Sequence, residues 1–323
     1  MSHGAWGIQV LVLVCYAAGV TAPLVVGLGR ATVDLLGVIP RFPEQQDAEL
    51  ELGEVCIQVG GGVAVAMGTL AALGCRARVY CTLADDFLAG FIRAAMRRAG
   101  IDLHAHVARG RQMSGLQFAA LSRDPPRRLG LFSPGDCDEP EDVDAQRAVE
   151  GAAAVLIDGV YPRAQAALAE QAKTQGVPVI VDGSQLREGT GALVGLADIL
   201  ICSERLAAEL APRDNLEDTL VEISRLGPRA VIITLGESGA VGLHGDTMVQ
   251  QAALPVACVD SKGAGAVYHG AFAAALLSDL PFADCMEFAS AAAGLSSEVF
   301  GAWAGIPDRD AVTAAVRRMR EPD

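Results

Sequence analysis

The chain of 323 residues is 51% hydrophobic and 20% charged, which is typical of a folded globular protein and argues against a disordered one. Its length suits one large α/β domain or two smaller domains. The net charge of −14 argues against a nucleic-acid-binding protein, so a phosphorylated ligand would need a local positive site.

Residues 1–22 are interpreted as an N-terminal extension. Gly7–Val20 is an apolar run that no positively charged segment precedes, and it is too short to span a bilayer. It has some features of a secretory signal, with small residues near Thr21 and Ala22. An α/β pattern starts directly afterwards, however, which favours a poorly packed extension or a misassigned start. We expect no membrane partner.

The first half of the chain predicts a buried strand at Pro23–Gly29 that ends in a glycine turn. Asp34 follows in an apolar segment, where it is either a turn former or a group that holds a hydroxylated ligand. Residues 38–58 predict a small β excursion, in which Ala48–Leu52 alternates polar and apolar residues. Later elements are expected as a strand at Arg76–Leu83, a helix at Phe87–Arg98, two strands within 103–122 and a short strand at Leu129–Phe132.

Three glycines, Gly60 to Gly62, precede an alanine-rich helix expected at Val63–Leu73. They permit either the close approach of a ligand to the backbone or close packing of the helix against a neighbour.

The second half alternates strands and helices regularly, which predicts βα units and a parallel sheet. Its strands are expected to end near Asp158, Asp182, Ser203 and Thr234, and ligands bind beyond the carboxyl ends of such strands. Ser203 is expected to cap a helix that runs to about Leu210. The remaining expected elements are helices at Arg163–Thr174 and Leu216–Arg225, a β meander at 239–258, and helices near 264–278, 282–298 and 308–320.

The segment Val259–Phe272 predicts a strand end, a tight turn at Gly263-Ala264-Gly265 and a long apolar helix. Such a turn leaves the N–H groups of the first helical turn free, and together with the helix dipole they form an anion site. The alternative is a turn whose glycines serve backbone geometry alone.

Eight cysteines are spread along the chain without a CxxC pair, most of them in apolar runs: Cys15, Cys56, Cys75, Cys81, Cys137, Cys202, Cys258 and Cys285. This usage is typical of buried free thiols in a reducing compartment, and we expect a cytoplasmic protein. Of the five histidines only His104 and His106 are closely spaced, in an expected strand, so we predict no metal site built from them.

From about Pro23 to the C-terminus the chain resembles the PfkB/ribokinase family of carbohydrate kinases. Gly60–Gly74 resembles the first family signature, with a Gly-Gly start and a Leu-Gly end. Val259–Phe272 resembles the second, of the form D-T-x-G-A-G-D-x-F-x-G, and Thr234–Gly239 resembles the strand and turn beside the nucleotide. Ser203-Glu204-Arg205 is similar to a subgroup near the sulfofructose kinases.

This resemblance implies a Rossmann-type α/β sandwich with a small β lid from 38–58 and 103–122, and a homodimer formed through the lid. It implies transfer of the ATP γ-phosphate to a sugar hydroxyl with Mg²⁺. The implied sugar-binding positions are Asp34, Gly60, Gly61 and Val65, and those near the nucleotide are Ser203, Thr234, Gly236 and Gly239. Gly263, Ala264 and Gly265 would supply N–H groups to the transferring phosphoryl group.

The sequence departs from the family at several of these positions. Ala266 stands where the second signature has its general base, and an alanine accepts no proton. The two family threonines before the turn are Ser261 and Lys262, the phenylalanine is Tyr268, and the usual asparagine of the first signature is Val65. The family's N-x-x-E segment aligns with Ser203 to Leu206, which lacks both functional ends.

Lys262 is interpreted either as a cation beside the anion hole or as an exposed loop lysine. Asp260 is a surrogate base or, as in the family, a support for the loop. Three hypotheses follow: an impaired ATP-dependent sugar kinase, a catalytically inactive pseudokinase that binds sugar or nucleotide, and a nucleoside kinase of the same superfamily. The third has little support, because aromatic residues make up only 5% of the chain and offer few base-stacking surfaces.

Overall fold

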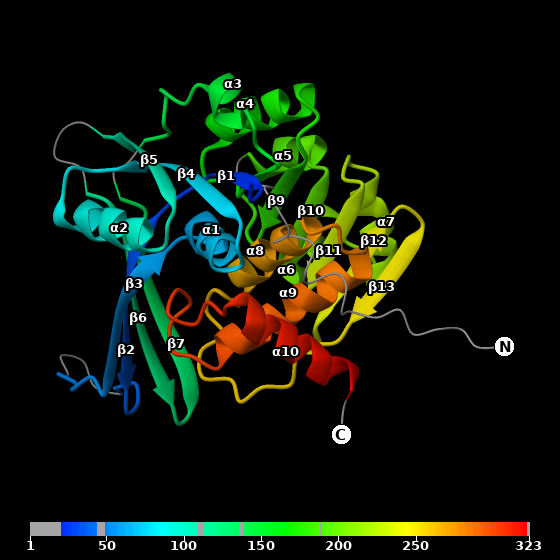
Figure 1. Cartoon of the computed structure of the whole chain (residues 1–323). Helices are drawn as coiled ribbons and strands as arrows, with labels where there is room; N and C mark the ends of the chain where they lie inside the picture. Colours follow the sequence, from blue (N-terminus) through cyan, green and yellow to red (C-terminus); the bar gives the residue numbers. More distant parts are fainter. Residues whose placement is uncertain (1–20, 44–48, 109–112, 136–137, 188, 322–323) are drawn as a thin grey trace.

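The computed structural model describes residues 21–43, 49–108, 113–135, 138–187 and 189–321 (Figure 1). In these ranges a nine-stranded sheet lies between two layers of helices, and a four-stranded sheet stands at one side. The extension expected at 1–22 therefore lies almost wholly outside the described residues.

The large sheet is parallel except at one edge, where β12 and β13 are antiparallel. In spatial order it consists of β13 (Thr247–Gln251), β12 (Ala240–His244), β11 (Ala230–Thr234), β10 (Ile199–Ser203), β9 (Val179–Gly183), β8 (Ala154–Ile157), β1 (Leu24–Leu28), β4 (Arg76–Leu83) and β5 (Asp102–Val107). Alternate residues of a strand enter different cores; Val25 faces one helix layer and Val26 the other. Because both faces are covered, the inner strands are apolar on both sides, as the sequence predicted.

The two helix layers differ in composition. One contains α1 (Gly62–Ala72), α2 (Phe87–Arg98), α8 (Ala264–Leu276), α9 (Phe282–Ser297) and α10 (Arg309–Arg320). The other contains α3 (Ala145–Val149), α4 (Pro162–Thr174), α5 (Thr190–Leu196), α6 (Glu204–Leu210) and α7 (Leu216–Ser224). The predicted α/β class and parallel sheet are confirmed, whereas the short helices α3 and α5 were not predicted.

The small sheet has the order β3 (Glu54–Gly60), β2 (Thr32–Ile39), β6 (Gly115–Arg123) and β7 (Pro126–Ser133). The expected lid ranges need correction, because β5 pairs with β4 in the large sheet and most of β2 precedes residue 38. Alternation identifies a strand but not its neighbour. The strand expected at Ala48–Leu52 is not formed by residues 49–52, and Ala48 lies outside the described residues.

The prediction of buried free thiols holds in part. Cys202 and Cys285 are buried thiols, and burial raises the pKa of each to about 12, but Cys258 is exposed. His104 contacts Asp102, and the described residues contain no cluster of three His, Cys, Asp or Glu side chains. Within the described ranges no helix is long and apolar enough to cross a membrane.

Helices α1 and α8 lie against each other at the centre of the first layer (Figure 1). Both are apolar on nearly every side, and α8 is buried from Ala266 to Ala275. At Gly270 of α8 an added Cβ would lie 2.3 Å from the Ala66 carbonyl oxygen of α1. The absence of a side chain at this residue therefore sets how closely the two helices approach.

Replacing Gly270 by alanine should lower the free energy of unfolding by about 1–3 kcal/mol, because the backbone of α1 cannot yield to the added methyl group. Gly90 is the matched control, since it is exposed in the interior of α2 and an added Cβ would meet nothing within 4 Å. Gly90→Ala should instead stabilise by about 0.5–1 kcal/mol through helix propensity. Urea unfolding followed by circular dichroism measures both, and shifts of the same sign would contradict the packing argument.

Candidate functional site

A pocket of about 440 Å³ lies where the carboxyl ends of β1, β8 and β9 face the small sheet. It is lined by Arg30, Thr32, Asp34, Gly60, Gly61, Gly62, Val65, Gln117, Phe132, Asp158, Val160, Asp182, Ser184, Gln185, Arg187, Lys262, Gly263, Gly265, Ala266 and Ala302. It brings together all the predicted sugar-binding positions and most of the predicted anion turn. Ser203, Thr234, Gly236, Gly239 and Ala264 are not part of its lining.

The glycines before α1 leave room for Asp34. An added Cβ at Gly60 would lie 2.0 Å from Asp34 Oδ1, so any side chain there would displace the carboxylate. Gly61 has a φ of 98°, and an added Cβ would lie 2.1 Å from the Arg30 carbonyl oxygen. The backbone of this turn thus approaches both β2 and the end of β1 at distances that only glycine permits.

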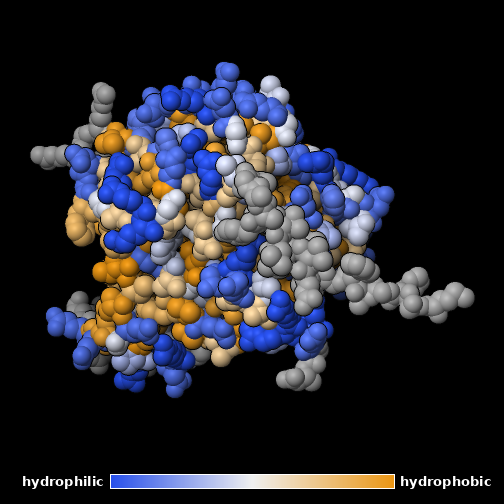
Figure 2. All heavy atoms as spheres, in the orientation of Figure 1, coloured by the Kyte–Doolittle hydropathy of each residue, from blue (hydrophilic) through white to orange (hydrophobic). Residues whose placement is uncertain are grey.

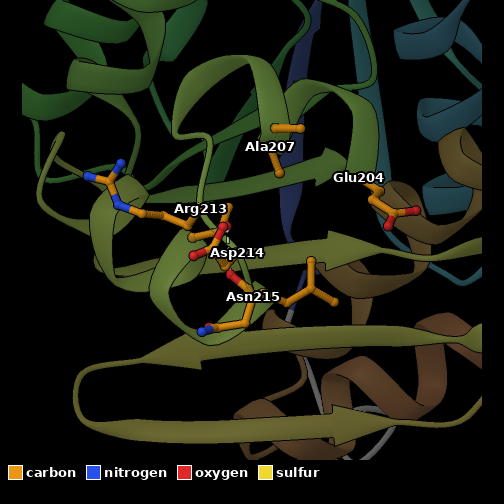
Figure 3. Close-up of a pocket in the computed structure, with 8 residues that line it drawn as sticks. Glu204, Ala207, Arg213, Asp214 and Asn215 are labelled. Carbon is orange, nitrogen blue, oxygen red and sulfur yellow. Dashed lines mark hydrogen bonds between the residues drawn. The ribbon is translucent and has the colours of Figure 1, made fainter.

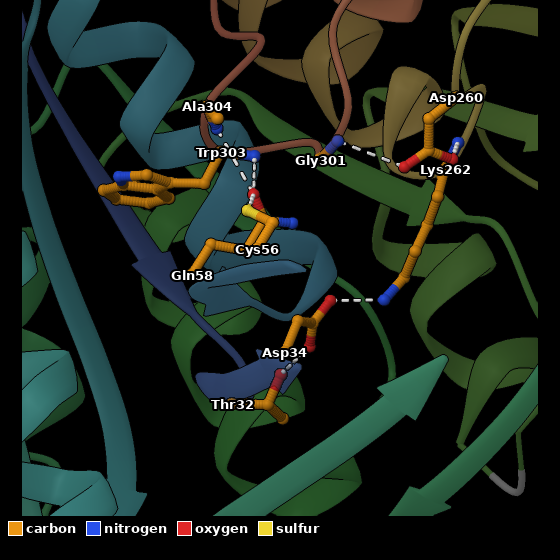
Figure 4. A network of polar contacts seen from close by, with 9 residues as sticks. All are labelled: Thr32, Asp34, Cys56, Gln58, Asp260, Lys262, Gly301, Trp303 and Ala304. Atoms are coloured by element: carbon orange, nitrogen blue, oxygen red, sulfur yellow. Dashed lines mark hydrogen bonds and ion pairs between the residues drawn. The ribbon is translucent and has the colours of Figure 1, made fainter. Parts of the chain in front are cut away.

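Asp34 is almost fully buried, with 3% of its side chain exposed, and it forms an ion pair with Lys262 (Figure 4). Thr32 donates a hydrogen bond of 2.9 Å to the other carboxylate oxygen of Asp34. Only 14% of the Lys262 side chain is exposed. The interpretation of Lys262 as an exposed loop lysine is therefore wrong, and its cation lies in the pocket at the predicted sugar-binding aspartate.

Asp260 holds the backbone of the loop that contains Lys262. Its Oδ1 accepts a 3.0 Å hydrogen bond from the Lys262 backbone N–H, and its Oδ2 accepts one of 3.2 Å from the Gly301 N–H (Figure 4). Both oxygens are thus engaged in holding the loop, and Asp260 is not among the residues that line the pocket. Of the two roles considered for Asp260, the geometry favours support of the loop.

The first turn of α8 opens into the pocket. Gly263 is its N-cap with φ 82°, and no side chain caps the turn. An added Cβ at Gly265 would meet nothing within 4 Å, so this glycine borders open space. Ala266, on the same turn, lines the pocket with a methyl group. The turn therefore lacks a side-chain cap and has no titratable side chain at position 266. The Ala264 N–H, expected to be free, instead donates to the Ser261 carbonyl oxygen over 3.3 Å.

The His269 side chain links the first turn of α8 to β10. Its Nδ1 lies 2.5 Å from the Gly265 carbonyl oxygen, and its Nε2 lies 2.9 Å from the Ile201 carbonyl oxygen of β10. Asp182 Oδ1 is 3.4 Å from the same Nε2. Both ring nitrogens therefore face oxygen atoms, and these contacts join the first turn of α8 to the ends of β9 and β10.

Two further carboxylates stand at the floor of the pocket. Burial raises the pKa of Asp158, and the charge of Asp182 adds to this, while a hydrogen bond from Gln165 acts in the opposite direction. Gln165 Nε2 donates to Asp158 Oδ1 over 2.9 Å. Gly62, at the start of α1, faces these groups, since an added Cβ would lie 3.0 Å from Asp182 Oδ2.

The lining residues that the sequence interpretation missed include Arg30, Gln117, Phe132 and Arg187. A weak signal existed for the arginines, because each follows a predicted strand at its carboxyl end, where ligands bind. No local signal existed for Gln117 and Phe132. They reach the pocket because β6 and β7 extend the sheet from β2, a pairing that no short pattern encodes.

The predicted nucleotide positions lie along the same edge of the large sheet. Ser203 and Thr234 are neighbours in the register of β10 and β11, and Ser203 Oγ donates to the carbonyl oxygen of Ser184, a lining residue, over 3.3 Å. Gly236 and Gly239 bound a 3₁₀ turn with φ values of 61° and 91°. Beside Gly236 there is open space, which suits the approach of a ligand to the backbone.

Mg²⁺ ligands are not supplied where the resemblance would put them. Leu206, aligned with the family's glutamate, is 1% exposed and packs in the second core. Ser203, aligned with the asparagine, accepts a 3.2 Å hydrogen bond from the Leu206 N–H as the cap of α6. The residues at this helix start therefore do not fit the family's magnesium-linked segment.

A smaller hollow lies between α6 and α7 and includes Glu204, Arg213 and Asn215 (Figure 3). Two of its polar residues have partners: Asn215 caps α7, and Arg213 pairs with Glu222 over 3.2 Å. We assign no function to it.

The family model described as pfkB family carbohydrate kinase matches residues 22–309. A ribokinase from Arabidopsis thaliana is 27% identical over 90% of this chain and 80% of its own length. The solved Arabidopsis ribokinase complexed with ribose and ATP superposes with a TM-score of 0.80 at 26% identity, over 92% of this chain and 99% of that one. A putative ribokinase from Agrobacterium tumefaciens gives a TM-score of 0.86 at 24% identity, over 94% and 100%.

A double-mutant cycle tests the ion pair. Lys262→Met and Asp34→Asn should each cost about 1–3 kcal/mol of unfolding free energy, because each leaves a buried group without its partner. The double variant should lose less unfolding free energy than the two single variants lose together. The difference, which is the coupling energy, should be about 0.5–3 kcal/mol by urea unfolding. Lys173→Met, at the exposed end of α4, is the control and should be additive with Asp34→Asn. Additivity of the Lys262 and Asp34 variants would contradict the pairing.

Proposed function

Because this chain belongs to the pfkB family of carbohydrate kinases, we propose that it binds a carbohydrate beside ATP and transfers the γ-phosphoryl group to it slowly. The carbohydrate occupies the pocket at Asp34, Gly60 and Gly61, and the transferring group lies at the first turn of α8. The reaction is slow because Ala266 offers no base for the acceptor hydroxyl.

One observation carries the proposal: the acceptor positions and the uncapped turn at Gly263 and Gly265 line a single pocket. Phosphoryl transfer depends chiefly on positioning and charge neutralisation, and the shared pocket and the uncapped turn support a role in both. A positioned base adds about 10²–10⁴-fold in rate, so its loss lowers turnover without removing binding.

ATP would lie along the adjoining edge of the sheet, with its base end toward Thr234, Gly236 and Gly239 and its phosphates toward α8. The Arabidopsis relative complexed with ribose and ATP supports this placement at the level of the family. ATP supplies the phosphoryl group; Ser203 and the turn at Gly236 are this chain's own contacts toward it. No step is assigned to Mg²⁺. The family's magnesium-linked glutamate aligns with Leu206, whose side chain has no oxygen.

The alternative is a pseudokinase that binds sugar or nucleotide without turnover. The burial of Leu206 and the pairing of Lys262 with Asp34 favour it. In the kinase, Lys262 has to share Asp34 with the acceptor hydroxyl; in the pseudokinase, the ion pair occupies the acceptor position.

A homodimer through the small sheet is also proposed. Ile57, Leu35, Phe118 and Leu131 stand opposite one another across β3, β2, β6 and β7, so they share one face. Ile57 and Leu131 are 53% and 57% exposed. Figure 2 shows hydrophobic surface gathered over the strands of the small sheet. An apolar sheet face of this kind is typical of an interface between copies of a chain.

Ala266→Asp should raise ATP turnover by about 10²–10⁴-fold with an acceptor that binds, because it returns a carboxylate to the first turn of α8. Ala266→Asn is the control of equal size, and it should give no comparable gain. ADP release is measured with neutral and phosphorylated sugars, together with calorimetric binding of ATP.

Wild-type turnover of about 1–100 s⁻¹, the range of ordinary kinases, would contradict an impaired site. If Ala266→Asp stays inactive while ATP and sugar bind, the pseudokinase is the correct alternative. If ATP fails to bind either protein, the nucleotide placement is wrong.

For the dimer, Ile57→Lys should raise the dissociation constant by about 30-fold or more, since a lysine buried without a partner costs about 2 kcal/mol or more. Leu226→Lys is the control, an exposed apolar residue that is 48% exposed after α7. Sedimentation equilibrium at several concentrations measures both. A monomeric wild type, or equal behaviour of the two variants, would overturn the assignment.

A further inference from the structure

We propose that the acceptor is a carbohydrate that already bears an anionic group, such as a phosphate monoester, and that Arg30 and Arg187 bind this group. The inference rests on the proposed function, because it concerns the acceptor of the same pocket, and it adds the chemical class of that acceptor.

Arg30 is held at the small-sheet side of the pocket. It follows β1, and its backbone is fixed by the close approach of Gly61. Its guanidinium lies over the ring of Phe132, 5.5 Å from the centroid, and its stem passes beside Gly115, where an added Cβ would lie 3.6 Å from Cδ. Stacking on an aromatic ring orients the guanidinium plane while leaving its N–H groups available to an acceptor.

Arg187 is held at the opposite side, beyond the end of β9. Its backbone N–H donates to Thr190 Oγ1 over 2.8 Å, which fixes the turn before α5. Its stem lies against Gly159, where an added Cβ would be 3.5 Å from Cδ. Its Nε is buried and has no hydrogen-bond partner. A buried donor without a partner costs free energy, which an oxygen acceptor on a ligand would recover.

The acidic groups of the pocket form no close ion pair with these two arginines, although the charge of Arg187 lowers the pKa of Asp158 against the larger effect of burial. Lys262 pairs with Asp34, and Asp182 faces His269. Asp158 accepts hydrogen bonds from Gln165 and the Val160 N–H, and its pKa is raised by burial. Within the described part of the chain, neither Arg30 nor Arg187 forms an ion pair. In a protein of net charge −14, two unpaired guanidinium groups in one pocket are a local exception.

A neutral sugar would not neutralise the charge of the two guanidinium groups. It would displace water from both guanidinium groups and offer only hydroxyl oxygens in return, whereas phosphate and carboxylate accept paired N–H···O bonds from arginine. The arginines follow β1 and β9, whereas the uncapped turn belongs to α8, so we assign the turn to the transferring phosphoryl group and the arginines to the acceptor's own anion.

The test is calorimetric binding to the full chain without ATP, at fixed ionic strength. The probes are ribose, fructose and glucose, each paired with its terminal phosphate ester, and gluconate as a carboxylate. At least one phosphate ester or gluconate should bind tenfold or more tightly than its neutral counterpart, and the preference should weaken as salt rises. Comparing gluconate with the esters distinguishes a carboxylate from a phosphate.

Arg30→Gln and Arg187→Gln should each weaken binding of the preferred anionic sugar by about 10–100-fold and change neutral-sugar binding less than twofold. Arg187→Lys should recover part of the loss. Arg225→Gln is the matched control, an exposed arginine beyond α7 that pairs with Glu222, and it should change nothing. Thermal unfolding of each variant checks that the fold is kept.

Equal affinity for neutral and anionic sugars, or arginine variants that weaken both alike, would overturn this inference and leave the proposed function standing. Unchanged binding of an anionic sugar by both glutamine variants would also overturn it, because the anion would then lie elsewhere, as at the turn of α8. If no sugar of either kind binds, the acceptor site fails, and the proposed function fails with it.

Discussion

The close contact between α1 and α8 is the constraint on which the site depends. Gly270 admits the Ala66 carbonyl at a distance that no side chain would allow, so the two helices lie together along their apolar length. Their N-termini, at Gly62 and Gly263, consequently open into the same pocket. Both ends are partially positive, and neither has a side-chain cap. The apolar core thus places two helix N-termini without side-chain caps beside one ligand space.

Two residues that differ from the family pattern, one in the loop before α8 and one in its first turn, change the charge of that space in the same direction. Compared with the resembled family, an aspartate has become Ala266 and a threonine has become Lys262, a change of two positive charges. Lys262 cancels Asp34, the buried carboxylate that would otherwise repel an anion. The same changes that remove the base therefore make the pocket more suitable for a negatively charged acceptor. Under the two proposals, slow transfer and an anionic acceptor both follow from the residues at positions 262 and 266.

What the sequence could predict was local. Helix α2, strand β4 and the cap of α6 by Ser203 follow from periodicity and capping residues, and they lie where they were expected. The charge relations of the pocket were not predictable in this way. Lys262 and Asp34 are 228 residues apart, and nothing near either residue indicates the other. Likewise the sequence of β5 predicts a strand but not the sheet to which it belongs. Only its pairing with β4 assigns it to the large sheet. Patterns of a few residues determine elements, whereas the site depends on which elements become neighbours.

The pocket also contains groups whose arrangement costs stability in the unliganded protein. Arg187 has a buried donor without a partner, Asp158 is a buried carboxyl group with a raised pKa, and the turn at Gly263 is uncapped. Each cost falls if a ligand supplies oxygen acceptors or a compensating charge. The packed layers of α1, α8 and α9 provide the stability that tolerates these costs. The buried Arg187 donor and the uncapped turn at Gly263 share one remedy, an oxygen acceptor that carries negative charge, and they support the proposed site for an anionic ligand, whether or not phosphoryl transfer follows binding.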